Sequence, residues 1–130
     1  MTILVADDNA FSRELMRELL QASGHTILEA VNGRNALDLI RRGGPDLVFL
    51  DLQMPMQDGF SVIRELRNES RFRKLPVVAV TASAMIGDRE RAIAAGFDSY
   101  IAKPIDLCEV ETHVSVFASR AQVGNDTQLR

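Results

Sequence analysis

The sequence predicts an α/β fold with a doubly wound parallel sheet, and three features of the chain indicate it. Five short apolar segments rich in β-forming residues alternate with amphipathic stretches of helical length. The third and fourth segments are apolar along their whole length, as is typical of strands that helices cover on both faces. The length of 130 residues is that of one domain.

The strands are expected at the apolar segments, which are residues 3–6, 26–29, 47–50, 77–80 and 99–102. The first helix is expected after Asn9, because apolar residues then recur at helical spacing until Gly24. This spacing predicts one buried stripe, made of Phe11, Leu15, Met16, Leu19 and Leu20.

The other helices are expected to begin at polar caps and to end at glycine or polar residues. They run from Asn32 to Gly43, from Asp58 to near Ser70, from near Ser83 to Gly96, and from Asp106 to near Ala118. Residues 119–130 have no periodic apolar pattern, so we expect a polar, frayed C-terminal tail or the start of a linker there. The predicted domain therefore spans residues 1–118.

The composition excludes several classes of function. A net charge of -3 and a pI near 5.3 provide no overall attraction to nucleic acid. The longest apolar runs are strand-sized, far short of the roughly 20 residues of a membrane helix. The sequence shows no positively charged segment followed by an apolar stretch with a small-residue cleavage site, and Cys108 is the only cysteine. We therefore expect a cytoplasmic protein that binds neither nucleic acid directly nor membranes.

Three carboxylates are expected at one edge of the sheet. Asp7 and Asp8 follow the first strand, and Asp51 follows the third. If these strands are neighbours, the like charges lie close together and need a compensating cation. Oxygen ligands suit a hard divalent ion, so Mg²⁺ is the leading candidate, with Mn²⁺ or Ca²⁺ as substitutes. Since Mg²⁺ commonly joins carboxylates to phosphate, the sequence favours phosphoryl transfer to Asp51.

Two further polar residues end other strands of the predicted sheet. Lys103 offers a compact positive charge, and the hydroxyl of Thr81 can donate a hydrogen bond. Simpler readings exist for each residue type taken alone. Aspartates before a helix often serve as caps, and a lone threonine is usually an ordinary strand residue. The prediction of a site depends on the whole set falling at the strand ends.

The motifs at these strand ends are Asp7-Asp8, Asp51 with Met54-Pro55 and Asp58-Gly59, Thr81-Ala82, and Lys103-Pro104. Through them, residues 1 to about 118 resemble the response-regulator receiver domain. The resemblance implies a flavodoxin-like three-layer sandwich, with five strands in the order 2-1-3-4-5 flanked by five helices. It also implies two-component signalling, in which Asp51 accepts a phosphoryl group from a sensor histidine kinase, a phosphotransfer protein or a small phosphodonor.

The resemblance further implies which residues bind the metal and the phosphoryl group. The metal would be held directly by Asp8, Asp51 and the backbone carbonyl of Gln53, and through water by Asp7. The phosphoryl oxygens would be bound by Lys103, Thr81 and the amide of Ala82. The cation and the phosphoryl group would thus share one pocket.

A switch and a control of phosphoryl lifetime are implied in the same way. Thr81 and Tyr100 would move together and change the face built from the fourth helix, the fifth strand and the fifth helix. A half-buried aromatic without a switching role explains Tyr100 equally well. Gln53 and Ser83 occupy the positions that tune access of hydrolytic water, and the Lys103-Pro104 bond is expected to be cis.

The sequence fits a phosphatase or a nucleotide-binding domain less well than a phosphorylation switch. A Mg²⁺-dependent phosphatase with an aspartyl nucleophile usually has a second carboxylate where Gln53 stands, and no glycine-rich nucleotide loop follows any strand. We therefore expect no enzyme beyond self-directed phosphoryl transfer and hydrolysis at Asp51. A constitutive docking domain and a receiver fragment of a larger regulator remain alternatives. Output is expected through an unidentified target protein or a phosphorylation-dependent homodimer.

Overall fold

Five parallel strands form the centre of the molecule. The structure, a computed structural model, describes residues 1–82 and 87–128, with side chains described as far as residue 120. The strands are β1 (Thr2–Ala6), β2 (Thr26–Ala30), β3 (Leu47–Asp51), β4 (Val77–Thr81) and β5 (Ser99–Ala102). All pair in parallel, in the order β2-β1-β3-β4-β5. The predicted strand positions and strand order are confirmed.

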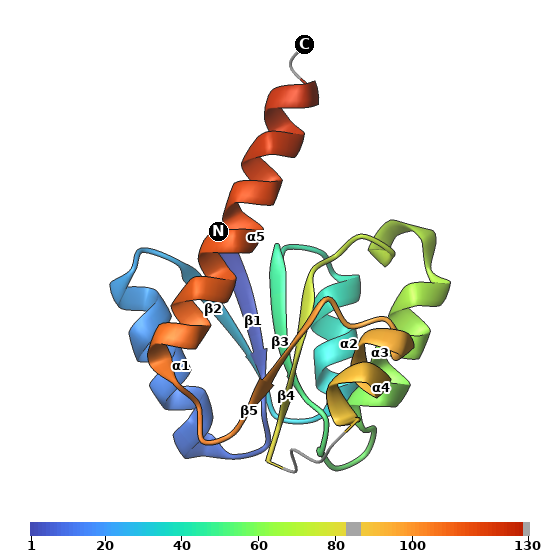
Figure 1. Ribbon diagram of the computed structural model, residues 1–130. Helices are drawn as coiled ribbons and strands as arrows, with labels where there is room; N and C mark the ends of the chain where they lie inside the picture. Colours follow the sequence, from blue (N-terminus) through green and yellow to red (C-terminus); the bar gives the residue numbers. More distant parts are fainter. Residues whose placement is uncertain (83–86, 129–130) are drawn as a thin grey trace.

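Helices cover both faces of this sheet. They are α1 (Ala10–Ala22), α2 (Gly33–Arg41), α3 (Gly59–Asn68), the 3₁₀ helix η1 (Ser70–Phe72), α4 (Asp88–Ala95) and α5 (Leu107–Gln128). Helices α1 and α5 lie on one face, and α2, α3 and α4 lie on the other, which confirms the predicted three layers (Figure 1). Among the described residues, no helix is both long and apolar enough to span a bilayer.

The predicted polar caps fix where four of the helices begin. Asn9, Asn32 and Asp58 each accept a hydrogen bond from the backbone N–H three residues further on. Asp106 accepts hydrogen bonds from the N–H groups of Cys108 and Glu109 in the same way. Each bond satisfies a helix N–H that has no partner within the helix, so short side-chain interactions locate these termini.

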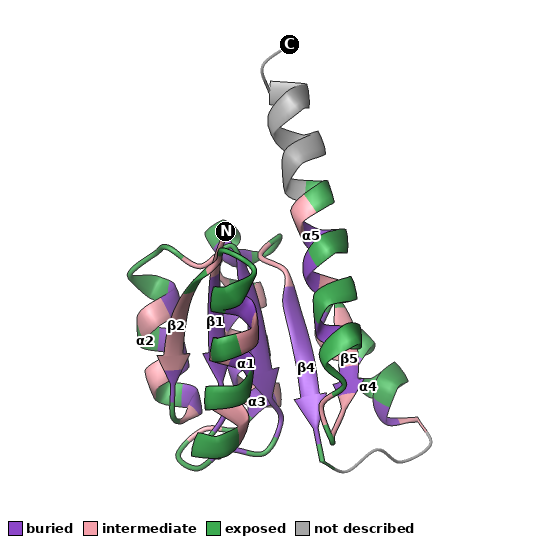
Figure 2. Cartoon of the chain, turned by 90° about the vertical axis from the view of Figure 1, so that its left-hand side faces the viewer, coloured by how far each residue is buried: buried purple, intermediate pink, exposed green. Residues whose placement is uncertain are grey.

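The sheet has a hydrophobic core on each of its faces. Strand residues alternate between the two: Leu47 and Phe49 pack with α1 and α5, whereas Val48 and Leu50 pack with the opposite helices. All five residues of β3 are buried, and Figure 2 shows the buried strands enclosed by helices whose outer surfaces are exposed. This two-sided burial explains why the central strands are apolar throughout.

The predicted buried stripe of α1 is wrong at two positions. Met16 and Leu20 are buried, but Phe11 is 70% exposed and Leu15 is 38% exposed. Phe11 and Leu15 are one turn apart on one side of the helix, whereas Met16 and Leu20 lie on the side that packs against the sheet. Helical spacing gives the direction of a stripe, whereas the extent of its burial depends on the partner element.

One helix boundary also differs from the predictions, and another falls outside the described residues. Helix α5 continues to Gln128, so the expected end near Ala118 is wrong, because a polar sequence without proline lets the backbone ladder continue. Helix α4 begins at Asp88, after Gly87 at φ 90°, a conformation that interrupts a helix. The expected start near Ser83 lies outside the described residues. The boundary between domain and tail at residue 118 stays a prediction.

Candidate functional site: an acidic pocket at the sheet edge

The acidic residues lie where the winding of the sheet reverses. From β1 the chain proceeds to β2 on one side, and from β3 it proceeds to β4 and β5 on the other. Since Ala6 is paired with Leu50, the residues that follow them, Asp7 and Asp51, reach the same edge next to each other. Open parallel sheets bind ligands at the carboxyl edge of this reversal point.

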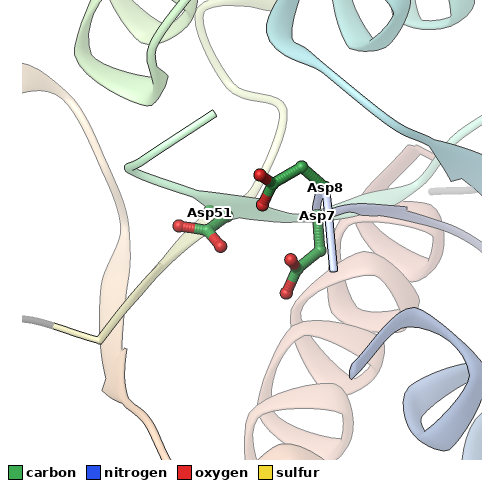
Figure 3. A group of neighbouring side chains, drawn as sticks. All are labelled: Asp7, Asp8 and Asp51. Carbon is green, nitrogen blue, oxygen red and sulfur yellow. The ribbon is translucent and has the colours of Figure 1, made fainter. Parts of the chain in front are cut away.

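Three carboxylates meet at this edge, as the sequence predicted. Asp7, Asp8 and Asp51 each offer an oxygen, and these oxygens lie within 4.8 Å of one another (Figure 3). Asp7 and Asp51 are buried, whereas Asp8 is exposed. Backbone N–H groups hold the two buried carboxylates: Asn9 donates to Asp7 at 2.8 Å, and Gln53 donates to Asp51 at 2.9 Å.

Lys103 supplies the counter-charge of the pocket. Its Nζ lies 2.8 Å from Oδ2 of Asp51 and 3.0 Å from Oδ2 of Asp7. The backbone N–H of Lys103 donates to the carbonyl of Thr81 at 2.7 Å, which joins the ends of β5 and β4. The Lys103-Pro104 peptide bond is cis, as expected. One ammonium group thus bridges two buried carboxylates that come from different strands.

Burial and the neighbouring charges have opposing effects on the pKa values of Asp51 and Lys103. Burial, together with the negative charge of Asp7, raises the pKa of Asp51 above its ordinary value, although Lys103 and the Gln53 N–H oppose the change. For Lys103, burial acts to lower the pKa, but hydrogen bonds to Asp51 and Asp7 outweigh it, so the pKa is raised. The lysine therefore stays charged at neutral pH, and the pocket keeps an excess of negative charge.

The donor set of the pocket fits a hard divalent cation. Three carboxylate oxygens at this spacing match the ligand type that Mg²⁺ prefers, and the exposed Asp8 leaves room for the waters that Mg²⁺ retains. Lys103 already neutralises part of the charge of Asp7 and Asp51. A bound cation would neutralise the remainder, so the residues present fit the predicted metal.

The remaining predicted residues surround the pocket. Thr81 is buried at the end of β4, and Ala82 follows it on the surface. Gln53 is exposed, and its backbone N–H bond to Asp51 places it beside that carboxylate. Tyr100 is half-buried on β5. Ser83 lies outside the described residues, so its predicted role stays a prediction.

Thr81 and Tyr100 lie on the same face of neighbouring strands. In the β4–β5 pairing, Ala79 is opposite Tyr100 and Thr81 is opposite Ala102. Because alternate residues of a strand share a face, Thr81 lies on the face of Ala79, diagonally across from Tyr100. The hydroxyl of Tyr100 is buried and makes no hydrogen bond with the described residues. This arrangement places both proposed switch residues under α4.

A cavity of about 200 Å³ opens next to the acidic pocket, lined by Leu52, Gln53, Phe60, Thr81, Asp88 and Arg91. Asp88, which the sequence analysis did not single out, is buried and forms an ion pair with Arg91 on the same helix. Burial raises the pKa of Tyr100, and the charge of Asp88 raises it further. The sequence signal that could have identified Asp88 is its position directly after a glycine at the start of a helix.

Gly59 allows α3 to begin close against the pocket, and we expect Gly59→Ala to destabilise the protein. A Cβ at this position would lie 2.8 Å from the carbonyl oxygen of Asp51 and 2.8 Å from Cα of Leu52. Both are backbone atoms and cannot rotate away, so overpacking should cost about 1–3 kcal/mol. Urea denaturation measures the change. Ser61→Ala, two residues later in the same helix, tests helix substitution without the clash, and equal stability of both variants would contradict the prediction.

Known proteins match this chain in sequence. The family model described as the response regulator receiver domain matches residues 3–115. The polar-differentiation response regulator DivK of Brucella anthropi is 41% identical over 106 residues, which are 82% of this chain and 86% of the relative. The protein of the same name from Brucella ovis is 40% identical over the same coverage.

Solved structures match the fold. The receiver domain of Francisella response regulator 1452 superposes with a TM-score of 0.86 at 27% identity, covering 92% of this chain and 98% of that one. The receiver domain of sensor histidine kinase PA1611 from Pseudomonas aeruginosa, which has a magnesium ion in its active-site cleft, gives 0.82 at 30% identity, covering 89% and 95%. Together with the acidic pocket, these matches show that the chain belongs to the response-regulator receiver domains of two-component signalling.

Proposed function

We propose that Asp51 is the phosphoacceptor of this receiver and that the reaction depends on Mg²⁺. The observation that carries this proposal is the shared contact of Lys103 with Asp51 and Asp7 beside a third carboxylate. The donor would be the phosphohistidine of a sensor kinase or phosphotransfer protein, or a small acyl phosphate. The protein is a signalling regulator, and its only chemistry would be transfer to Asp51 and hydrolysis from it.

The proposed transfer forms one bond and breaks another at phosphorus. A carboxylate oxygen of Asp51 attacks the phosphorus, and the bond to the donor breaks with its electron pair on the leaving group. An acyl phosphate donor leaves as a carboxylate, and a phosphohistidine leaves as an imidazole that keeps the proton on its other nitrogen. A bound cation would neutralise charge on the transferred oxygens.

Each pocket residue has a role in this proposal. Asp8, Asp51 and the Gln53 carbonyl would hold Mg²⁺, with Asp7 acting through water, and Mn²⁺ or Ca²⁺ would substitute. Lys103 would move from the carboxylates to the phosphoryl oxygens, since these carry more charge. Thr81 and the Ala82 amide would bind the remaining oxygens, and Gln53 and Ser83 would tune hydrolysis. Residues 1–118 would form the functional unit in the cytoplasm.

The test is direct phosphorylation of the purified protein. Incubation with acetyl phosphate and Mg²⁺ should add one phosphoryl group to the intact mass, and EDTA should prevent it. Borohydride reduction converts an aspartyl phosphate to homoserine, so peptide mapping should find homoserine at position 51. No adduct in folded protein, or an adduct at another residue, would reject the proposal and favour a constitutive docking domain.

We further propose that phosphorylation changes the face formed by α4, β5 and α5. Tyr100 on β5 lies diagonally across from Thr81, so a displacement of Thr81 toward the phosphoryl group would open space next to the ring. An altered face would bind a downstream protein or a second copy of the chain.

Tyr100 is the only tyrosine, and the chain has no tryptophan, so its fluorescence reports this switch without interference. We expect phosphorylation to change the emission of wild type. In Thr81→Ala, the adduct seen by mass should form without that change, because the coupling side chain is absent. Thr112→Ala on α5 serves as the control and should behave as wild type. If phosphorylation changed the Tyr100 emission in Thr81→Ala as much as in wild type, Thr81 would not be what moves Tyr100.

A further inference from the structure

Arg13 joins the backbone of the acidic pocket to the neighbouring strand. From the first turns of α1, its Nη1 donates a hydrogen bond of 2.8 Å to the carbonyl oxygen of Asp7. Its Nε lies 3.4 Å from Oε1 of Glu29 on β2, and the side chain is only 16% exposed. The guanidinium therefore donates to the main chain of the pocket loop and forms an ion pair with the Glu29 carboxylate, although Nε itself makes no hydrogen bond with the described residues.

Every other polar group of Asp7 is already fixed. Its N–H donates to the carbonyl of Ala30 at 3.1 Å, and its carboxylate accepts from Asn9 and Lys103. Only the carbonyl remains, and this carbonyl belongs to the peptide that leads into Asp8. Because a peptide unit is planar, fixing its oxygen also fixes the N and Cα of the next residue.

Asp8 depends on this backbone for its position. Its exposed side chain forms no hydrogen bond or ion pair with the described residues, so nothing but the main chain directs its carboxylate toward Asp51. We propose that Arg13 is a positioning residue for the acidic pocket, which holds the Asp7–Asp8 peptide so that Asp8 faces the shared cation site. This inference rests on the proposed function, since the cation is the one the phosphoryl reaction requires.

Positioning and charge have opposite effects on metal binding. Removing a positive charge next to an acidic pocket strengthens its attraction for a cation. Removing a group that orients a metal ligand weakens binding, typically by tenfold or more. The direction of the change in Mg²⁺ affinity therefore shows which of the two effects is larger.

Arg17 provides a matched control on the same helix. It lies one turn further along α1 and pairs with the same Glu29 at 3.1 Å, but within the described part of the chain it makes no hydrogen bond to the Asp7 carbonyl. Calorimetry on the unphosphorylated protein should show an Mg²⁺ dissociation constant about tenfold higher for Arg13→Met. It should show an unchanged or lower value for Arg17→Met. Arg13→Lys, which keeps the charge, should resemble Arg13→Met if geometry is what matters.

A second measurement needs no metal. The Asn9 N–H is bonded to Oδ1 of Asp7, so release of the loop should speed its amide hydrogen exchange about tenfold in Arg13→Met. Exchange in Arg17→Met should match wild type. If Arg13→Met does not fold, Glu29→Gln, which removes the carboxylate that pairs with Arg13, replaces it in the exchange measurement and should also speed exchange at Asn9. The Mg²⁺ affinity of Glu29→Gln does not separate the two roles, because loss of a negative charge by itself weakens cation binding.

The positioning role would be overturned if Arg13→Met bound Mg²⁺ and exchanged the Asn9 amide hydrogen as wild type does. It would also be overturned if Arg17→Met changed both quantities as much as Arg13→Met. Absence of Mg²⁺ binding in wild type would instead reject the proposed function. In that case the exchange experiment, performed without metal, would still decide whether Arg13 holds the loop.

Discussion

Replacing Asp51 by Asn should abolish phosphoryl incorporation completely. An amide oxygen is a poor nucleophile and carries no charge, so neither the acyl phosphate nor the full cation site can form. Intact-mass measurement after incubation with acetyl phosphate and Mg²⁺ checks this result. Asp46→Asn, at the start of β3 and the opposite edge of the sheet, is the control and should be phosphorylated like wild type. An adduct on Asp51→Asn would place the phosphoacceptor elsewhere.

The same substitution should raise stability at neutral pH without metal. Burial, followed by the charge of Asp7, holds the pKa of Asp51 above its unfolded value, so ionised Asp51 favours the unfolded state. A group of this kind contributes stability at low pH that is lost as pH rises through the folded pKa. The stability difference between variant and wild type should therefore shrink as pH falls from neutral toward the ordinary carboxyl range. Urea denaturation across this window gives the result, and a constant difference would contradict the assigned pKa direction.

Lys103→Met should give the largest loss of stability among pocket substitutions. The side chain neutralises two carboxylates whose own side chains are only 5% exposed. Removing one partner of a buried ion pair leaves uncompensated charge, which costs about 3 kcal/mol. Thermal or urea denaturation in EDTA measures this loss. Acyl phosphate should also react more slowly, because the phosphoryl oxygens lose their cationic partner.

Mg²⁺ should restore much of this stability. A cation that binds only the folded state stabilises it by about 2.7 kcal/mol at a hundred times its dissociation constant. With Lys103 absent, the pocket attracts the cation more strongly, so Mg²⁺ should raise the melting temperature of the variant more than that of wild type. Lys74, the other lysine of the chain, is exposed at the far end of the sheet, and Lys74→Met should show neither effect. Equal stabilisation of wild type and Lys103→Met would contradict the electrostatic assignment.

Local signals in the sequence were sufficient for most of the fold. The strands are short apolar segments with fixed spacing, and the caps at Asn9, Asn32 and Asp58 act within three residues of themselves. Interactions of such short range depend little on the rest of the molecule, so sequence analysis predicted them correctly. The exposure of Phe11 and the continuation of α5 to Gln128 were predicted wrongly, because burial depends on neighbouring elements and because a polar segment that includes Gly124 can still continue a helix.

The apolar segments and their order were enough to predict that Asp7, Asp8 and Asp51 follow the first and third strands, because the carboxyl ends of parallel strands share one edge of the sheet. The bridge from Lys103 to Asp7 and Asp51, and the bond from Arg13 to the Asp7 carbonyl, could be seen in the three-dimensional structure alone. Both contacts are made by long side chains with several rotatable bonds. Where such side chains end depends on charges and carbonyls that approach from other elements, and no pattern within the sequence specifies them.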